Sequence, residues 1–263
     1  MLPEWHHVPM YAVLALLGAG AAWFYFHRRL HQRGENPGRT EQAFLWGVLG
    51  ALLGAKLLYL LPLLPRLWAD LLLLRTAPAD FMAQYFSGGF VFYGGLLGGL
   101  AGAWLFCRRR GLAFAALGRD LVPALPLFHA FGRVGCFLAG CCYGIPAPLP
   151  WLGVVFPAGA VEAPGGVPLL PVQLYEAVGC FLLFLLLDRL AQRGWPGDRL
   201  LALYLALYAA ARFGLEFLRG DAARGFLGPL STSQVFSLGV LAVLLLWFAG
   251  ELLHARRDVR ERP

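Results

Sequence analysis

The chain has 263 residues, of which 59% are hydrophobic and only 14% are charged. Its mean hydropathy is +0.63, whereas about 25% of the residues of a soluble domain are charged. This composition excludes an ordinary soluble globular protein and predicts a protein that crosses a membrane several times. The net charge of +7 follows a topological pattern, described below, and is therefore no indication of nucleic-acid binding.

Seven apolar segments are long enough to cross a hydrocarbon core, which takes roughly 17–25 helical residues. Helices are expected because an open segment in lipid must satisfy its own backbone hydrogen bonds. The predicted fold is therefore all-α, a polytopic membrane protein forming one domain over residues 1–263. Its spans are predicted at roughly 8–26, 43–61, 90–106, 121–140, 170–187, 200–218 and 232–250. The first segment is too long for a signal peptide's apolar region and has no small-residue cleavage pattern, so we expect it to be retained.

Arginine clusters indicate the orientation of these spans. Residues 27–39, 107–119, 188–199 and 254–263 contain 15 of the 22 Lys and Arg, and they follow the first, third, fifth and seventh spans. The positive-inside rule places all four clusters in the cytoplasm. We therefore predict that the N-terminus and the loops 62–89, 141–169 and 219–231 lie outside, and that the C-terminus lies in the cytoplasm.

Several ionisable residues interrupt the apolar segments. Such a group costs a few kcal/mol in a membrane unless it has a partner, so it indicates a functional site. The residues concerned are Lys56, Arg133, Glu176, Arg212 and Glu216. At 1.5 Å per helical residue, the first four lie about 8–10 Å below the outer ends of their spans. Gln173, Tyr11 and Tyr93 enter the same layer, which predicts a polar cavity open to the outer leaflet. The alternative is an ion-pair network that only locks helices together.

The balance of these charges favours an anionic ligand. Arg212, Glu216 and Arg219 are spaced i, i+4 and i+7, so Glu216 can neutralise an Arg on its own helix face. Arg133 and Lys56 then share Glu176 as the remaining acid. Because a guanidinium binds phosphate with two parallel hydrogen bonds, the expected ligand is a phospholipid head group of the outer leaflet.

Two further patterns leave alternatives open. The glycine-rich stretch 88–99 either packs helices closely or offers backbone to a head group, and no strand precedes it as a dinucleotide motif requires. Cys136, Cys141 and Cys142 have the spacing C-x4-C-C, which is not that of a structural zinc site. They are small packing residues, a disulfide or reactive thiol at an oxidising face, or metal ligands; we expect no metal and no cofactor.

Motifs along nearly the whole chain point to one family. Tyr11 lies in the first span, where that family has Tyr-Gly, and Gln234 follows the last motif. The remaining matches occur in the family's order at 54–59 (Gly-Ala-Lys-Leu-Leu-Tyr), 88–99, 120–144, 171–177 (Pro-Val-Gln-Leu-Tyr-Glu-Ala) and 212–219 (Arg-Phe-Gly-Leu-Glu-Phe-Leu-Arg). By these motifs the chain resembles the bacterial prolipoprotein diacylglyceryl transferases.

The resemblance implies an activity and a location. The family transfers diacylglycerol from phosphatidylglycerol to the lipobox cysteine thiol of lipoprotein precursors, at the outer face of the cytoplasmic (inner) membrane, and releases glycerol-1-phosphate. The expected partners are therefore phosphatidylglycerol, a lipoprotein precursor peptide and the membrane, with no nucleic acid.

The resemblance also implies roles for individual residues. Arg133 and Arg212 are expected to clamp the phosphate and stabilise the leaving group, and Tyr93 stands where the family has a His that helps to activate the acceptor thiol. The other expected substrate-binding residues are Tyr11, Lys56, Gly132, Gly135, Cys136, Gly144, Gln173, Tyr175, Glu176, Glu216 and Arg219.

The chain departs from the family at several polar positions. Cys136, Ala139 and Cys141 replace two Asn and a Glu, and Leu169-Leu170 replaces a basic pair. One alternative is therefore a lipid-binding or lipid-transporting paralogue that keeps the head-group pocket without the chemistry. Another is a thiol site at the three cysteines for redox chemistry or transient acylation.

Overall fold

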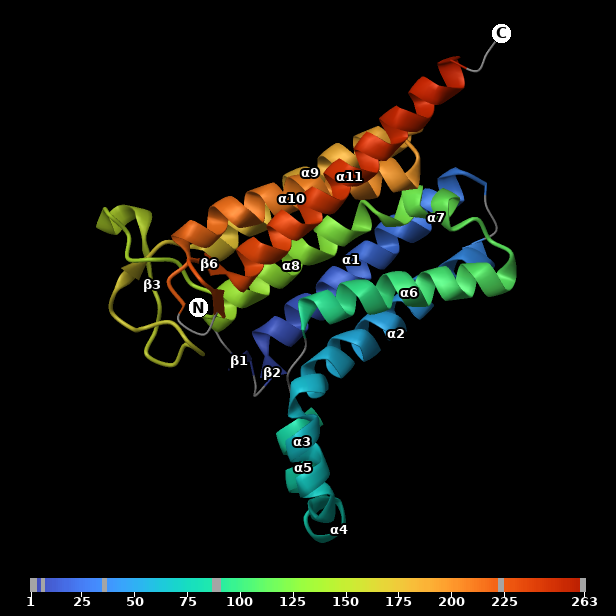
Figure 1. The fold of residues 1–263 in the computed structure, drawn as a ribbon. Helices are drawn as coiled ribbons and strands as arrows, with labels where there is room; N and C mark the ends of the chain where they lie inside the picture. Colours follow the sequence, from blue (N-terminus) through green and yellow to red (C-terminus); the bar gives the residue numbers. More distant parts are fainter. Residues whose placement is uncertain (1–3, 6–7, 35–36, 87–90, 222–224, 261–263) are drawn as a thin grey trace. The chain divides into compact units, whose positions relative to one another are not determined.

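The computed structural model describes residues 4–5, 8–34, 37–86, 91–221 and 225–260 (Figure 1). The chain divides into two compact units, residues 1–26 with 118–263 and residues 27–117, and we describe each by itself. The long helices are α1 (Met10–Gln32), α2 (Pro37–Leu60), α6 (Phe92–Arg110), α8 (Ala124–Ala139), α9 (Val172–Gln192), α10 (Gly197–Leu215) and α11 (Thr232–Arg260). The prediction of a single domain stays a prediction.

The unit of residues 27–117 is built on the pair α2 and α6, which lie side by side (Figure 1). A Cβ at Gly50 would lie 2.2 Å from the carbonyl oxygen of Gly98, and one at Gly54 would lie 2.3 Å from that of Gly94. Only glycine allows two backbones to approach so closely. The structure thus supports the packing interpretation for 94–99, whereas residues 88–90 lie outside the described part.

Short helical pieces connect α2 to α6 in the same unit. They are η1 (Leu61–Leu63), α3 (Leu64–Ala69), η2 (Asp70–Leu72), α4 (Leu73–Thr76) and α5 (Pro78–Phe86). The Tyr85 hydroxyl donates to Asp70 Oδ2 at 2.6 Å, which ties α5 back to η2. Three of these pieces have Pro at or next to their first position, where the missing N–H costs no hydrogen bond.

The other unit consists mainly of α8, α9, α10 and α11, with the first part of α1 and the short α7 (Phe114–Leu121), whose last residues belong to it. A buried apolar core joins the segment before α8 to α9 and α10 and includes Val122, Leu183, Leu187, Leu200 and Tyr204. Helix α1 approaches α8 at glycine: a Cβ at Gly135 would lie 3.3 Å from Tyr11 Cα. This arrangement sets the first residues of α1 and α9 and the last residues of α8 around one region.

A folded segment connects α8 to α9 at one end of these helices (Figure 1). It contains η3 (Pro150–Leu152) and the antiparallel pair β3 (Val154–Val155) and β4 (Pro168–Leu169). Phe156, Ala163 and Leu169 form its small buried core. The remaining short elements are η4 (Glu216–Leu218) and the antiparallel pairs β1 (Glu4–Trp5) with β2 (Val8–Pro9) and β5 (Phe226–Leu227) with β6 (Leu230–Ser231).

Within the described residues, five helical stretches are long and apolar enough to cross a membrane: Met10–Gln32, Thr40–Thr76, Leu117–Ala139, Gly197–Leu218 and Thr232–Glu251. They coincide with five of the predicted spans and confirm a helical, multi-pass membrane protein. The second stretch, at 37 residues, continues beyond the predicted 43–61. Helices α6 and α9 cover the other two predicted segments, and a total of seven spans and the orientation of the termini stay predictions.

Candidate functional site

Glu176 is the centre of a buried ionic cluster formed by α8, α9 and α10. Its Oε1 lies 3.0 Å from Arg133 Nη2 and accepts a hydrogen bond from the Tyr208 hydroxyl at 2.9 Å. Its Oε2 lies 3.9 Å from Arg212 Nη1. Since the side chain of Glu176 is only 4% exposed, its charge depends on these partners.

Arg212 extends the cluster from α10 toward α11. Its Nη2 lies 2.7 Å from Glu216 Oε2 and donates to Ser233 Oγ at 3.1 Å. Its Nη1 is buried without a hydrogen-bond acceptor among the described residues. A guanidinium carries five N–H donors, so Arg212 can hold its two carboxylates and still bind a further anion.

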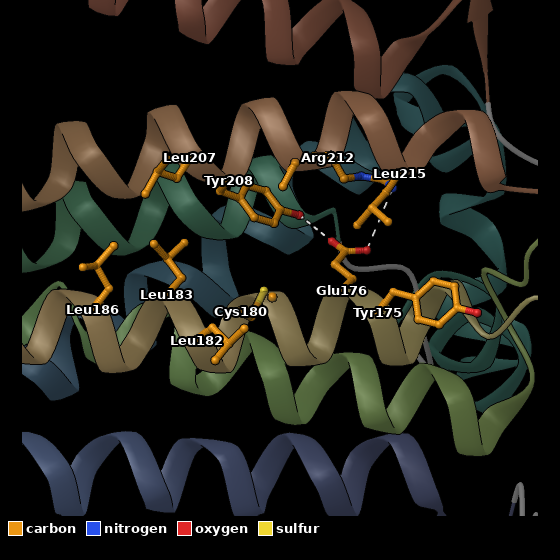
Figure 2. A pocket seen from close by; sticks show the side chains of 12 residues that line it. Tyr175, Glu176, Cys180, Leu182, Leu183, Leu186, Leu207, Tyr208, Arg212 and Leu215 are labelled. Carbon is orange, nitrogen blue, oxygen red and sulfur yellow. Dashed lines mark hydrogen bonds and ion pairs between the residues drawn. The ribbon is translucent and has the colours of Figure 1, made fainter.

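A cavity of about 550 Å³ adjoins this cluster between α9 and α10. Figure 2 shows Glu176, Tyr208 and Arg212 meeting at its polar part, while Leu183, Leu186 and Leu207 lie farther along the same two helices. Tyr175, which is 41% exposed, lines the opposite end. The lining is therefore ionic in one part and aliphatic in the rest, as an amphiphilic ligand requires.

The structure brings together four of the residues selected from the sequence: Arg133, Glu176, Arg212 and Glu216. It adds three that sequence reasoning missed, Tyr208, His129 and Ser233. His129 Nε2 lies 3.8 Å from Glu176 Oε1. His129 precedes Arg133 by four residues and Tyr208 precedes Arg212 by four, so each lies on the same helix face as its Arg, and this spacing could have indicated both.

Arg219 does not share a helical face with Arg212 and Glu216, as the i, i+7 spacing predicted. Helix α10 ends at Leu215, η4 follows, and Arg219 has extended backbone angles. Its Nε donates to Asp221 Oδ1 at 2.8 Å, and its backbone pairs with Gly144. Burial disfavours the charged guanidinium, but the hydrogen bond to Asp221 and nearby negative charge outweigh burial and raise its pKa. Arg219 therefore links the segment after α10 to the segment after α8.

The pairing of Arg219 with Asp221 changes the charge balance inferred from the sequence. In this unit, the buried cations Arg212 and Arg219 and the partly buried Arg133 face Glu176, Glu216 and Asp221. The cluster therefore has no excess of Arg by itself. An anion would bind by recruiting spare guanidinium donors, not by neutralising unpaired cations.

The remaining predicted residues of this unit have different surroundings. Gly135 lets Tyr11 pack against α8, and Gly144 lets the chain pass Leu170, whose carbonyl oxygen would lie 2.4 Å from a Cβ. Gly132 faces open space. The buried Gln173 donates from Nε2 to the Cys141 carbonyl oxygen at 2.7 Å, so it holds the chain after α8 against α9.

Three thiols lie close together where α8 ends. The Sγ atoms of Cys136, Cys141 and Cys142 are all within 4.8 Å of one another. Hydrogen bonds from the two neighbouring thiols, together with the positive charges of Arg133 and Arg219, lower the pKa of Cys142 although burial opposes this.

Lys56 and Tyr93 belong to the other unit. Lys56 Nζ lies 4.8 Å from the ring centroid of Tyr59 and 5.3 Å from that of Phe86, which are cation–π distances. Tyr93 lies in the first turn of α6, and its side chain lies outside what the structure describes. Their predicted place beside Arg133 stays a prediction.

These features define the class of the protein: a helical multi-pass membrane protein with a buried Arg–Glu cluster beside a largely aliphatic cavity. Comparison with known proteins goes further. Residues 3–249 match the prolipoprotein diacylglyceryl transferase family. The chain belongs to this family of transferase enzymes of lipoprotein biosynthesis, which confirms the resemblance found in the sequence.

Individual relatives agree with this assignment. The chain is 34% identical to a phosphatidylglycerol–prolipoprotein diacylglyceryl transferase of Clostridium tetani, over 90% of this chain and 91% of the relative. It is 34% identical to phosphatidylglycerol–prolipoprotein diacylglyceryl transferase 2 of Clostridium perfringens, over 96% and 94%. Identity is also 34% to the enzyme of that name from Geobacter sulfurreducens, over 95% and 92%.

Proposed function

We propose that this chain transfers a diacylglyceryl group from phosphatidylglycerol to the lipobox cysteine thiol of prolipoproteins. The names of its relatives contain both substrates. The observation that carries the proposal furthest is that Glu176 and Arg212 line the polar part of an aliphatic cavity, with Arg133 paired to Glu176 behind it. An anionic head group and an acyl chain joined in one molecule fit these two surroundings.

The proposed reaction is an S-alkylation. The acceptor sulfur attacks the glyceryl carbon that bears the phosphate ester, a carbon–sulfur bond forms and the carbon–oxygen bond breaks. The electron pair stays on the phosphate oxygen, glycerol-1-phosphate leaves, and the acceptor thiol gives up its proton by way of Tyr93. Arg133 and Arg212 hold the phosphate, where fixed positive charge stabilises the leaving anion. Glu176 and Glu216 orient these two Arg through the ion pairs described above.

Other residues have supporting roles in this proposal. Tyr93 donates or accepts a proton near the reacting groups. The head group and glyceryl region of the lipid contact Tyr11, Lys56, Gln173 and Tyr175. The substrate site is also lined by residues of α8 and of the segment after it: Gly132, Gly135, Cys136 and Gly144. Arg219 keeps the segments around Gly144 in place.

We further propose that the protein lies in the bacterial cytoplasmic membrane as one domain with seven spans. Helices α6 and α9, with 19 and 21 residues, complete the five stretches that already have spanning length. The Arg clusters then place the N-terminus outside, the C-terminus in the cytoplasm and the charge cluster in the outer part of the membrane.

The test uses purified protein, phosphatidylglycerol and a peptide with a lipobox cysteine. Mass spectrometry should detect one diacylglyceryl group on the peptide and release of glycerol-1-phosphate. Peptide with Ser in place of Cys is the control for the acceptor atom. Phosphatidylglycerol binding without product from any thiol peptide would contradict the proposal and favour a lipid-binding paralogue, the alternative suggested by Tyr93 in place of a His.

A further inference from the structure

The thiol cluster of Cys136, Cys141 and Cys142 has no role in the chemistry above beyond lining the site. Its three Sγ atoms lie within 4.8 Å of one another. Zinc binds thiolate sulfur at about 2.3 Å with tetrahedral angles, so two sulfurs on one ion lie roughly 3.8 Å apart. The observed separations, none above 4.8 Å, are therefore within about 1 Å of the spacing that a three-thiolate site needs.

The backbone after α8 is built to gather these side chains. Gly140 adopts φ 73° and ends the helix, and the Cys141 N–H donates to the Cys136 carbonyl oxygen at 3.1 Å. This is the hydrogen bond of a Schellman turn, which folds the following residues back over the last helical turn. Cys142 continues the turn with φ 56°, a left-handed conformation that non-glycine residues rarely adopt.

The burial and charge of the surroundings also suit a metal ion. Cys136 is buried, while Cys141 and Cys142 are partly exposed, so the cluster is accessible from one side. Arg133 precedes Cys136 by three residues and therefore lies on the same face of α8. Three thiolates and one divalent cation carry a net charge of −1, and Arg133, although also paired with Glu176, lowers the electrostatic cost of that charge.

Against the expectation of no metal from the sequence, the geometry leads to a different inference: we propose that Cys136, Cys141 and Cys142 bind one Zn²⁺ and leave its fourth position open for the acceptor thiol. Thiolates select soft cations such as zinc, and zinc sites with three protein ligands keep a position for substrate. The inference rests on the proposed function, because it assigns the acceptor's binding place within that same site.

Zinc would activate the acceptor thiol, which the side chains of this site do poorly. A phenol such as Tyr93 is a weak base at neutral pH, whereas a thiol that coordinates zinc loses its proton outright. In the proposed step, the acceptor S–H would bind zinc and its proton would pass by way of the Tyr93 hydroxyl to water. The sulfur held there would attack the glyceryl carbon, and the phosphate would leave with the electron pair of the broken carbon–oxygen bond. Neither step changes an oxidation state.

The metal itself is tested first. Protein purified without chelator should contain one zinc per chain, and the double variant Cys141→Ser/Cys142→Ser should contain less than a tenth of that. Cys107→Ala, which removes a buried thiol in the other unit, is the matched control and should keep the zinc. A thiol titration of denatured wild type should find five free thiols. A disulfide within the cluster, or copper bound in place of zinc, would overturn the proposal.

The open position is tested with Co²⁺ in place of zinc. Lipobox peptide should change the visible spectrum of the cobalt protein, and peptide with Ser in place of Cys should not. Chelation of wild type should abolish transfer at least a hundredfold without loss of phosphatidylglycerol binding, and Zn²⁺ should restore it.

These measurements separate the inference from the proposed function. Full transfer by metal-free wild type would overturn the zinc site and leave the transferase assignment intact. Zinc binding and a thiol-dependent cobalt spectrum without any transfer would contradict the transferase assignment and keep the zinc site. A cobalt spectrum indifferent to the peptide thiol would overturn the open fourth position.

Discussion

At the scale of single residues, Glu176 decides how the two site arginines are held. It contacts Arg133 at 3.0 Å and Arg212 at 3.9 Å from opposite carboxylate oxygens, and Tyr208 donates to it from α10. One carboxylate thus fixes two guanidiniums from different helices. An anion that enters between them meets donors already oriented, which is how preorganised charge stabilises a leaving group.

The first prediction concerns these two arginines. Arg133→Lys and Arg212→Lys should each lower transfer about 10- to 100-fold. An ammonium keeps the charge but loses the planar fork, a charged hydrogen bond contributes about 1.5–3 kcal/mol, and each 1.4 kcal/mol is about tenfold in rate. Arg110→Lys, at an exposed position of α6, should be unaffected. Wild-type rates in both site variants would refute the phosphate clamp.

The second prediction concerns Tyr93. Tyr93→Phe should lower the transfer rate about 100-fold, the range that proton transfer by one side chain contributes, while phosphatidylglycerol affinity changes less than twofold. Tyr93→His should retain transfer because imidazole also donates and accepts protons. Rates and lipid affinities are measured separately, and a Phe variant that transfers normally would reduce Tyr93 to a packing residue.

At the scale of elements, close helix packing in the unit of residues 27–117 depends on glycines spaced by four. Gly50 and Gly54 of α2 face Gly94 and Gly98 of α6, with contacts to backbone oxygen that no side chain could tolerate. Between helices in lipid, van der Waals contact of this kind replaces the hydrophobic driving force. The α2–α6 pair is therefore sensitive to the addition of single methyl groups.

The third prediction compares two glycines on α6. A Cβ at Gly98 would lie 2.2 Å from the Gly50 carbonyl oxygen, whereas one at Gly95 would meet its nearest neighbour at an ordinary 3.5 Å. Gly98→Ala should lose about 1–3 kcal/mol through overpacking, a fall of several degrees in melting temperature. Gly95→Ala, with the same gain in helix propensity, should be neutral or slightly stabilising.

A thiol-reactive dye provides the measurement for this pair. Cys107 is fully buried in α6, so its labelling on heating reports the opening of this unit. The dye also reacts with the other cysteines, so Cys107→Ala protein is measured in parallel. The labelling that this variant lacks is assigned to Cys107. Equal melting temperatures for the two glycine variants would show that α2 and α6 are not in this close contact.

At the scale of the whole molecule, the sequence predicted the membrane helices and the charged residues within them, because both have strong local signals. Apolar segments with Arg-rich ends identify membrane helices, and charges inside such segments stand out, which is why Arg133, Glu176, Arg212 and Glu216 were found. Tyr208, His129 and Ser233 were missed because such residues also serve as ordinary packing groups in helices. Asp221 was missed because its pairing with Arg219 depends on how the chain leaves α10, which helical spacing cannot predict.

The last prediction concerns orientation. Cysteine introduced at Arg39, Arg110, Arg193 or Arg256 should resist an impermeant thiol reagent added outside the cell, because the positive-inside rule keeps these clusters in the cytoplasm. Cysteine at Trp151 or Val161 should react, since both side chains are well exposed, at 76% and 67%, in the segment predicted outside. Native thiols are first blocked from outside with an unlabelled reagent.

The logic of this scan is that each Arg cluster follows a different span. If one cluster alone reacted, a single helix pair would fail to cross the membrane. The first helices to reconsider as spans would be α6 and α9, because they are not among the five spanning stretches found in the described residues. If two or more reacted, the alternation of spans would be lost and the seven-span arrangement would be wrong. Only full protection at all four sites, together with labelling at Trp151 and Val161, keeps the thiol cluster and the Arg–Glu cluster on the side from which a prolipoprotein arrives.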